Sequence, residues 1–317
     1  MTNENDELEN IAKAQPAWRK VGRWALLIIL ILSILGSWLI FSQGGLASLT
    51  VWYLAQLFLP LLGFGALSIV IIHWLRARHL SLPMILTAIV AIISILPLFW
   101  LLGLWSITYP VSIENAEPAA TVRLPANEEL TVAWGGDSVK TNYHAATPDQ
   151  RWAYDLIVAP YLSESENLED YGCYGIKVLA PANGRIVIAH DGEKEQVPGK
   201  LQTSLNPYGN HVVIELPTET YLVIAHLKLD SVAVSAGDMV QEGETIGQCG
   251  NTGNTSEPHI HVHHQRQNPA EFPVNFAEGL PLYFRDHNGP AMPQGGYLEE
   301  GDQAILTGDI VQHQGGR

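Results

Sequence analysis

The segment SEPHIHVHHQ at residues 256–265 holds four histidines within six positions. Alternate side chains of a β-strand lie on one face, so His259, His261 and His263 would point the same way. His264 would point to the opposite face. Two histidines at this spacing are a common pair of metal ligands, because imidazole nitrogen suits Zn²⁺. The pattern also fits a wet strand, and we expect His263 and His264 to be solvated at its end. A metal site therefore needs further ligands elsewhere in the chain.

The histidine pair is the last of several short motifs between about residues 130 and 265. They follow one another as NYHAATPDQRWAYD, LAPANGRIVIAHDG, NPYGNHVVIEL, IAHLKL, AGDMVQEGETIG and GNTGNTSEPHIH. This order resembles the lysostaphin-type zinc metallopeptidases, the LytM or M23 family, which cut peptidoglycan peptides. The resemblance implies an antiparallel, barrel-sandwich-like β fold for this region.

The resemblance also implies roles for five side chains. His144, Asp155 and His261 would be the protein ligands of one Zn²⁺. His226 and His259 would be catalytic histidines that do not bind the metal. The family commonly spaces its first two ligands as H-x-x-x-D, whereas ten residues separate His144 from Asp155 here. His144 is nevertheless the only histidine between the apolar N-terminal region and Asp155.

Two imidazoles and one carboxylate leave one tetrahedral position of Zn²⁺ open, which is typical of a catalytic site. Such an ion lowers the pKa of bound water to about 7 and polarises a carbonyl group. The chain has no H-E-x-x-H motif, so a glutamate base is not expected. We expect His259 to take a proton from the attacking water and His226 to donate a hydrogen bond to the oxyanion. The two roles could be exchanged.

Short β-rich runs broken by turn residues fill the region after residue 128, among them LTVAW, IKVLA, GRIVIAH, HVVIEL and TYLVIAHL. We therefore predict an all-β domain over 129–265, with only a weak helical signal near 163–170. His190 and His211 are expected to be structural or solvated. A tight turn should present His259 and His261, formed by Asn251, Gly253 and Asn254. Residues 266–317 read as a C-terminal extension of unknown role.

Two N-terminal stretches, 24–75 and 79–113, contain no Asp, Glu, Lys or Arg. A soluble domain must present charged groups to water, whereas a membrane helix needs about 20 apolar residues. We predict three transmembrane helices within 24–109, at about 24–42, 50–74 and 83–108. The SQGG segment at 42–45 would separate the first two helices, and Pro97 could kink the third.

Basic residues precede the first predicted helix and separate the second from the third: Lys13, Arg19, Lys20, Arg23, Arg76 and Arg78. Positive loops face the cytoplasm, so residues 1–23 would be cytoplasmic. Three crossings then place the chain after about residue 110 outside a bacterial cytoplasmic membrane, in the periplasm or extracellular space. Residues 110–128 would be a linker, and membrane lipid would be one partner.

The outer part is acidic, with 11 Lys and Arg against 28 Asp and Glu over 110–317, a net charge of −17. This charge argues against a nucleic-acid partner. It gives no attraction to anionic wall polymers either, so tethering to the membrane would supply local concentration.

Both cysteines, Cys173 and Cys249, lie in this outer part. A disulfide suits an oxidising compartment, but two packed thiols fit equally well.

These features predict a membrane-anchored zinc endopeptidase that cuts peptidoglycan stem or cross-bridge peptides, although a secreted peptide is another possible substrate. Membrane or division proteins are further possible partners.

One alternative is an inactive LytM-type scaffold that activates other wall hydrolases. A second is a biotinyl or lipoyl-like binding module, since VLAPANGRIVIAH and SAGDMVQEGETIG resemble its hairpins. That module needs a lysine in an M-K-M or D-K-A motif, which the chain lacks. A metal transporter would need ionisable residues in its spans, and only His73 lies there.

Overall fold

The computed structural model describes residues 17–200, 204–300 and 303–315, and they fall into two compact units. The helical unit contains the residues up to 43 together with 50–105. The β unit contains 44–49 together with the residues from 106 onward. Most of the predicted cytoplasmic segment, 1–16, lies outside the described residues.

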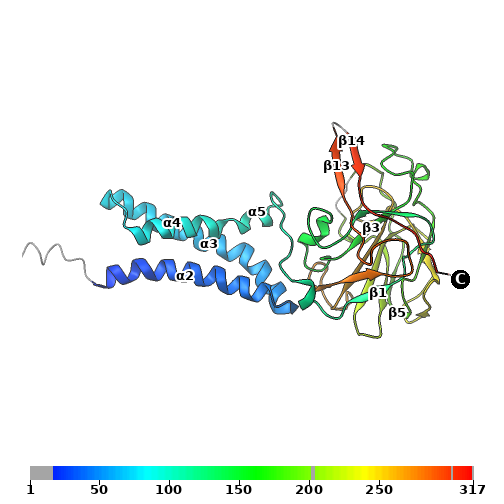
Figure 1. Cartoon of the computed structure of the whole chain (residues 1–317), viewed down its shortest axis with the longest axis horizontal. Coiled ribbons are helices and arrows are strands. Elements are labelled where there is room, and N and C mark those ends of the chain that lie inside the picture. The colour runs from blue at the N-terminus through cyan, green and yellow to red at the C-terminus, as the bar shows by residue number, and fades with distance from the viewer. Residues whose placement is uncertain (1–16, 201–203, 301–302, 316–317) are drawn as a thin grey trace, which may run out of the picture. The chain divides into compact units, whose positions relative to one another are not determined.

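Three long apolar segments make up the helical unit (Figure 1). Its helices are α2 (Ala17–Phe41), α3 (Gly45–Ala77), α4 (Leu82–Ile95) and the short α5 (Pro97–Leu101). By length and composition alone, three stretches with mean hydropathies of 2.6, 2.2 and 2.6 could cross a membrane: Trp24–Phe41, Gly45–Ala77 and Leu82–Leu101. The prediction of three apolar helices, with a break near residues 42–45, is confirmed.

The third apolar segment is interrupted at Pro97, and it ends at Leu101 rather than at the expected Thr108. Proline has no amide hydrogen, and its ring clashes with the carbonyl group four residues earlier. α4 therefore ends at Ile95, and α5 continues only to Leu101. Gly103 follows with φ +66, a left-handed conformation that ends helices and that glycine adopts without strain.

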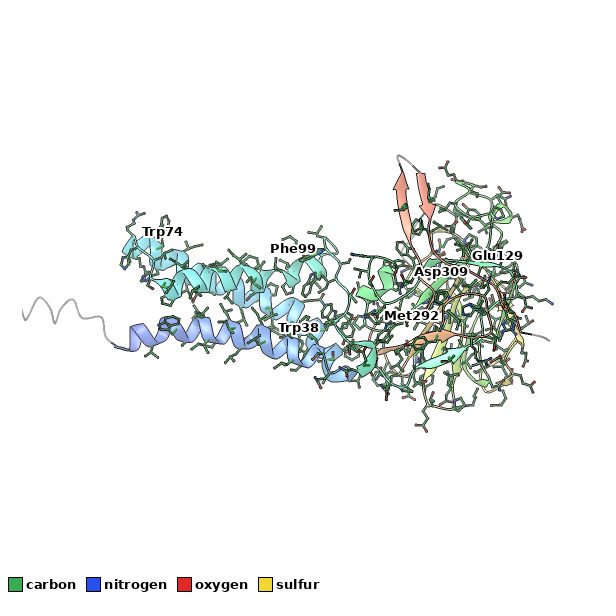
Figure 2. All side chains as sticks on the ribbon, viewed as in Figure 1. Trp38, Trp74, Phe99, Glu129, Met292 and Asp309 are labelled. Carbon is green, nitrogen blue, oxygen red and sulfur yellow. A yellow bond between two sulfur atoms is a disulfide. The ribbon has the colours of Figure 1, made fainter. Side chains whose placement is uncertain are left out.

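A buried apolar cluster joins the three helices. Leu30 of α2, Ala66 of α3 and Ala91 of α4 form one buried cluster. A Cβ atom at position 63 would lie 2.6 Å from the carbonyl oxygen of Ala91, so the contact requires Gly63. The outward-facing side chains are also apolar and include Trp38, Trp74 and Phe99 (Figure 2). A surface of this kind suits lipid better than water.

One antiparallel sheet forms the centre of the β unit. Its strands are ordered β15-β2-β3-β10-β7-β6-β5-β8, and β11 pairs with β10. Their bounds are β2 Leu130–Trp134, β3 Tyr154–Ile157, β5 Gly184–His190, β6 Asn210–Glu215, β7 Tyr221–Leu227, β8 Met239–Val240, β10 Ile260–Gln265, β11 Gly279–Leu280 and β15 Ile310–Val311. The predicted antiparallel all-β architecture is confirmed.

Three smaller strand pairs complete the described part of the β unit: β1 (Ala120–Val122) with β12 (Leu282–Phe284), β4 (Lys177–Leu179) with β9 (Thr245–Gln248), and β13 (Tyr297–Glu300) with β14 (Gln303–Leu306). β1 falls in the predicted linker, and β11 to β15 fall in the predicted extension. Leu282, Phe284 and Val311 are buried in the same core as Val122. Both flanking segments therefore belong to the packed β unit.

The two faces of the sheet carry different side chains, because successive residues alternate along a strand. On β10, Ile260 and Val262 enter the apolar core. His261 points to the other face, and the register places it opposite Asp155 of β3 on one side and Ala225 of β7 on the other. The antiparallel register thus brings polar side chains from distant parts of the sequence together.

Beyond residue 110, the described chain has no α-helix and only 3-10 turns: η1 (Ile113–Asn115), η2 (Tyr143–Ala146) and η3 (Leu168–Asp170). η3 lies at the end of the weak helical signal.

Cys173 and Cys249 form a disulfide with both residues buried, which decides between the two states that the sequence left open. The bond closes a loop with a sequence separation of 76. Loop closure of this length reduces the entropy of the unfolded chain and stabilises the fold by about 4 kcal/mol.

Candidate active site

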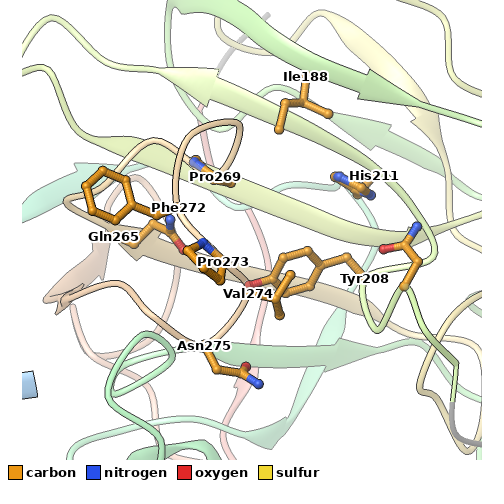
Figure 3. A pocket seen from close by; sticks show the side chains of 10 residues that line it. Ile188, Tyr208, His211, Gln265, Pro269, Phe272, Pro273, Val274 and Asn275 are labelled. Carbon is orange, nitrogen blue, oxygen red and sulfur yellow. The ribbon is translucent and has the colours of Figure 1, made fainter. Parts of the chain in front are cut away.

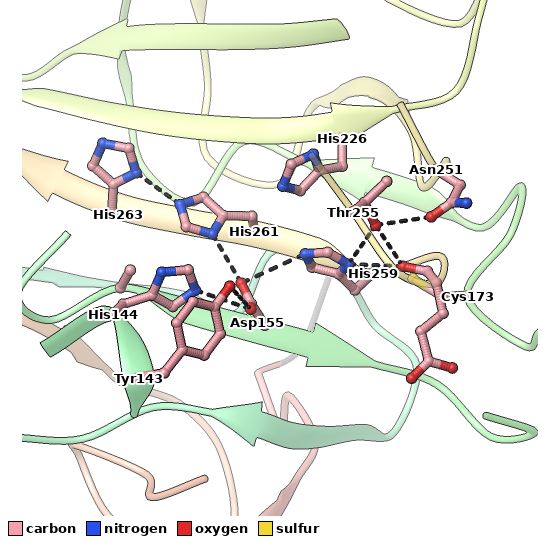
Figure 4. Close-up of polar contacts among 12 residues, drawn as sticks. Tyr143, His144, Asp155, Cys173, His226, Asn251, Thr255, His259, His261 and His263 are labelled. Atoms are coloured by element: carbon pink, nitrogen blue, oxygen red, sulfur yellow. Dashed lines mark hydrogen bonds and ion pairs between the residues drawn. The ribbon is translucent and has the colours of Figure 1, made fainter. Parts of the chain in front are cut away.

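Asp155 lies at the centre of the candidate site, on β3, and is almost fully buried. Its Oδ2 atom lies 2.9 Å from Nε2 of His144 (Figure 4). Its Oδ1 atom lies 2.8 Å from Nδ1 of His261, and this contact follows from the pairing of β3 with β10. The three side chains predicted as ligands therefore lie together, with their ligand atoms within 4.8 Å of one another.

Asn142 holds the loop that carries His144. Its Oδ1 atom accepts a hydrogen bond from the amide of His144 at 3.2 Å. Its Nδ2 atom donates to the carbonyl oxygens of Gly136 and Ala153, each at 3.0 Å. The side chain is fully buried, so it ties both ends of the loop together. This explains how ten intervening residues still bring His144 against Asp155.

His226 and His259 face the same centre (Figure 4). Nδ1 of His226 lies 2.7 Å from the carbonyl oxygen of Thr252. Nδ1 of His259 lies 2.8 Å from the carbonyl oxygen of Glu257. A carbonyl oxygen only accepts, so both Nδ1 atoms carry a proton, and in the neutral ring Nε2 is the atom that presents a lone pair. Nε2 of His259 lies 3.6 Å from Oδ1 of Asp155.

The backbone of His226 departs from regular strand geometry, with φ +61. Ile224 enters the apolar core and Ala225 faces the polar side with His261, so strict alternation would send His226 into the core. The left-handed conformation instead turns its side chain toward His259, with ring centroids 4.6 Å apart. Such strain costs about 1–3 kcal/mol and is typical of functional positions.

The loop after the disulfide supports both of these histidines. The amide of Gly250 donates to the carbonyl oxygen of His226, and Oγ1 of Thr252 donates to that of Leu227. Oγ1 of Thr255 donates to Asn251 and lies 3.2 Å from Nδ1 of His259. Gly253 has φ +83, in agreement with the predicted turn. Asn251 also donates through Nδ2 to Gln196, an anchoring role that the sequence did not reveal.

His263 is buried, so the prediction that it is solvated was wrong. Its Nδ1 atom lies 2.9 Å from Nε2 of His261, and its Nε2 atom lies 3.0 Å from Oε1 of Gln265. Nε2 of Gln265 donates to the carbonyl oxygen of Gln267, so its Oε1 accepts. His263 must then donate through Nε2 and accept at Nδ1 from His261. This chain fixes the tautomer of His261 and leaves a lone pair on its Nδ1 atom.

That lone pair faces an oxygen of Asp155 2.8 Å away. Burial lowers the pKa of His261 to about 4, so the imidazole is neutral near pH 7. Burial alone would raise the pKa of Asp155, but His144 and His259 hold it well below its usual range, and the carboxylate is ionised. Two facing acceptors repel each other unless a cation lies between them. Two imidazoles and a carboxylate match the ligands of Zn²⁺, so these residues fit the ion that the sequence predicted.

A second group of three also has its nitrogen atoms within 4.8 Å of one another: His226, His259 and His261. It shares His261 with the first group, and it contains both predicted catalytic histidines. Histidine alone can also bind Zn²⁺. The geometry therefore offers two overlapping ligand sets around one centre, and only the first contains a carboxylate.

His264 points to the opposite face, as predicted, but it is buried rather than solvated. Its Nε2 atom lies 2.7 Å from Oγ1 of Thr220, and burial lowers its pKa to about 4. His211 is also buried, with Nδ1 2.7 Å from the carbonyl oxygen of Gly209. His190 is partly exposed beside Glu193. These histidines are structural or solvated, and none belongs to either ligand set.

The candidate site opens into a pocket of about 270 Å³. Asp155 and His259 of the candidate site are among its lining residues. The rings of Trp134 and Tyr297 stack with centroids 4.8 Å apart, and Tyr143 meets Trp134 edge-on at 5.1 Å. The sequence analysis missed this aromatic wall. Tyr143 adjoins His144 and could have been suspected, but Tyr297 lies in the extension and carries no such signal.

A smaller pocket of about 80 Å³ lies between the sheet and the segment 269–275 (Figure 3). Tyr208, His211 and Gln265 line its sheet side, and Phe272 lies on the other. The ring of Tyr208 contacts both His211 and His263, with centroids 5.6 Å apart in each case. This space holds only a few water molecules, and the larger pocket is the one that reaches Asp155.

Residues 169–273 match the family Peptidase_M23, "Peptidase family M23". The chain carries a domain of this family. The matched range includes His226, His259 and His261 of the M23 domain, whereas His144 and Asp155 precede it. The site therefore combines residues within the matched range with two that the structure brings to it.

Two curated proteins of Vibrio cholerae are similar to the M23 domain. Peptidoglycan DD-endopeptidase ShyA is 30% identical over 131 residues, which cover 40% of this chain and 28% of ShyA. Peptidoglycan DD-endopeptidase ShyC is 32% identical over 87 residues, which cover 27% of this chain and 18% of ShyC. The chain thus spans less than a third of the length of either relative. Among solved structures, the catalytic domain of lysostaphin from Staphylococcus simulans matches with a TM-score of 0.30 and 20% identity, over 48% of this chain and 89% of that one.

Proposed function

We propose that this protein is a membrane-anchored zinc endopeptidase that hydrolyses peptide bonds in peptidoglycan. One observation supports this proposal above all: a buried carboxylate and two imidazoles, of Asp155, His144 and His261, lie around one centre at the base of an open pocket. The similarity of the M23 domain to two peptidoglycan DD-endopeptidases supports the choice of substrate.

His144 would bind the ion through Nε2, His261 through Nδ1 and Asp155 through its carboxylate. Bound there, Zn²⁺ would supply a Lewis acid that polarises the scissile carbonyl group and activates water. The chain of His263 and Gln265 holds His261 in the tautomer that this requires. Asn142 holds the loop of His144 in place, so that ligand is positioned before any ion binds.

His226 and His259 would handle protons. Both have Nδ1 protonated against a carbonyl oxygen, so Nε2 of either can accept a proton from the attacking water. Burial, followed by the nearby His259 and His261, holds the pKa of His226 well below its usual value. His226 is therefore neutral before reaction, and it can stabilise an oxyanion as a donor only after Nε2 gains a proton. Since the two histidines have the same tautomer, the roles assigned to them from the sequence could be exchanged.

The location of the M23 domain would be the periplasmic or extracellular side of a bacterial cytoplasmic membrane. Three apolar helices that could span a membrane support an anchor. A buried disulfide suits an oxidising compartment. With a net charge of −17 over 110–317, the outer part would rely on tethering rather than charge to stay close to an anionic wall.

The test is zinc analysis of the full chain together with digestion of purified cross-linked muropeptides. Wild-type protein should hold one Zn²⁺ and cut a peptide bond that mass spectrometry of the products identifies. His261→Ala should lose both properties, whereas His190→Ala, which changes a histidine outside the site, should keep both. Bound zinc without cleavage, and no loss of cellular function in His259→Ala, would instead support an inactive scaffold that activates other wall hydrolases.

A further inference from the structure

Glu257 places a carboxylate in the active-site pocket beside His259. The residue is 8% exposed, and its Oε2 atom accepts a hydrogen bond from the amide of Leu162 at 2.9 Å. Its own carbonyl oxygen accepts from Nδ1 of His259 and lies 2.9 Å from Oγ1 of Thr255. Both ends of Glu257 are therefore fixed, and Oε1 has no donor among the residues that the structure describes.

The charges around this carboxylate are not balanced by the protein. Neither lysine nor arginine is among the eleven residues that line the pocket. The other lining carboxylate, Asp155, is turned toward His144 and His261. Burial raises the pKa of Glu257, while the amide of Leu162 and His259 lower it. A buried carboxylate of this kind gains most from a ligand that brings a positive charge.

The aromatic wall lines the same pocket as Glu257. Trp134 and Tyr297 are stacked, and Tyr143, which is 51% exposed, adds an accessible ring. Burial, followed by Glu257 and Asp155, raises the pKa of Tyr297 to about 12. Its hydroxyl thus stays protonated near neutral pH and remains a donor. Aromatic surfaces bind ammonium groups and the methylene chains that carry them.

We propose that Glu257 and the wall formed by Trp134, Tyr143 and Tyr297 are a subsite for a primary ammonium group of the substrate, close to the scissile bond. This inference rests on the proposed peptidase function, and it adds a positive charge to the substrate that the site selects. A substrate carboxylate at this position would be repelled by Glu257. A neutral apolar group would leave Oε1 of the buried carboxylate without a donor.

Three peptides test the proposal. The first is a cross-linked muropeptide with a free side-chain amine near the cleaved bond, the second is the same peptide with that amine acetylated, and the third carries its only amine at the N-terminus. Cleavage of all three peptides is measured with the full, zinc-loaded chain in detergent. The proteins compared are wild type, Glu257→Gln and Tyr297→Leu. Glutamine keeps an oxygen acceptor for the amide of Leu162, so Glu257→Gln should fold. Glu166→Gln, which changes an exposed glutamate paired with Lys200, is the matched control.

Wild type should favour the free amine over its acetylated form by about tenfold or more in kcat/KM. Glu257→Gln should lose this preference, and Glu166→Gln should keep it. Tyr297→Leu should weaken it. The third peptide shows whether a side-chain or an N-terminal amine occupies the subsite. Equal cleavage of free and acetylated peptides by wild type would overturn the subsite while leaving the proposed function in place.

Calorimetric binding of the same peptides to metal-free protein separates the two proposals. If wild type cuts none of them but binds the free amines more tightly, and Glu257→Gln does not, the subsite holds and the peptidase proposal fails. If there is neither cleavage nor preferential binding, both proposals fail.

Discussion

Nε2 of His261 lies 2.9 Å from Nδ1 of His263, two residues along the same strand. Both side chains are buried, and Gln265 continues the chain of hydrogen bonds. Because Gln265 can only accept from His263, each proton in the chain has one allowed position. The consequence is a lone pair on Nδ1 of His261, directed at the centre where Asp155 also presents an oxygen.

This relationship predicts that His263 supports metal binding without being a ligand. His263→Phe should reduce the affinity for Zn²⁺ by about 10–100-fold, because His261 loses the partner that fixes its tautomer. His263→Asn should recover most of the affinity, since its Oδ1 atom can replace Nδ1 as acceptor. Competition with a chromogenic chelator measures both variants. Equal affinities in wild type and His263→Phe would contradict the prediction.

The disulfide should matter more for catalysis than for metal binding. Cys249 begins the loop that holds His226 and His259, whereas the predicted ligands His144 and Asp155 belong to other elements. The double variant Cys173→Ser, Cys249→Ser should lower the free energy of unfolding by about 4 kcal/mol. It should also lose much of kcat while it keeps zinc.

Unfolding in urea, metal analysis and muropeptide cleavage test these points. Dithiothreitol should reproduce the effect in wild type and have none on the double variant. Loss of zinc in step with activity would show that the loop also holds the metal ligands.

The sequence was sufficient where one physical requirement determined the outcome. Charge-free stretches of membrane-spanning length became apolar helices, and short β-rich runs between turn residues became antiparallel strands. Asp155 and His261 were assigned from the family resemblance, and the sheet register pairs them on neighbouring strands. The end of the third helix was less predictable, because the number of helical residues after Pro97 depends on tertiary contacts.

Other features depend on contacts that no local pattern encodes. His263 looked like a solvated strand end, but Tyr208 and Gln265 cover it. Tyr297 enters the pocket only because the chain after residue 266 packs back onto the sheet, through β11 and β15. Such contacts follow from where distant segments pack, so they could be recognised only in the folded chain.

Stability should fall as the pH decreases below neutral, and His264 should account for part of the loss. Its pKa is about 4 in the folded state but about 6.5 in the unfolded chain. Between these values the unfolded chain binds more protons, so the free energy of unfolding falls as pH falls. The contribution of His264 between pH 7 and pH 5 is about 2 kcal/mol. Asp149 acts in the opposite direction, because burial raises its pKa to about 6.

His264→Gln keeps a polar side chain beside Thr220 but cannot titrate, so its stability should depend less on pH by about 2 kcal/mol over that range. Urea unfolding of the full chain at both pH values gives the comparison. His190→Gln, at a partly exposed histidine, is the matched control for the substitution itself. An unchanged slope in His264→Gln would assign the acid sensitivity to other groups.

Asn142 should determine whether His144 reaches the centre at all. Asn142→Ala removes three hydrogen bonds from a fully buried side chain, which should cost about 2–3 kcal/mol of stability. The loop would then hold His144 less firmly, so zinc affinity should also fall. Asn254→Ala changes an exposed asparagine and should leave zinc affinity unchanged. Chelator competition and urea unfolding measure the two effects separately.

The two overlapping histidine groups lead to a decisive set of variants. If His144, Asp155 and His261 bind the ion, then His144→Ala and His261→Ala should lose zinc. His226→Ala and His259→Ala should retain it and lose about 10²–10⁴-fold in kcat, which is the usual contribution of general acid–base catalysis. If His226, His259 and His261 bind it instead, His226→Ala should lose zinc and His144→Ala should keep it. The metal content of His144→Ala and His226→Ala therefore distinguishes the two ligand sets before any substrate is tested, because only one of these variants removes a ligand under each arrangement.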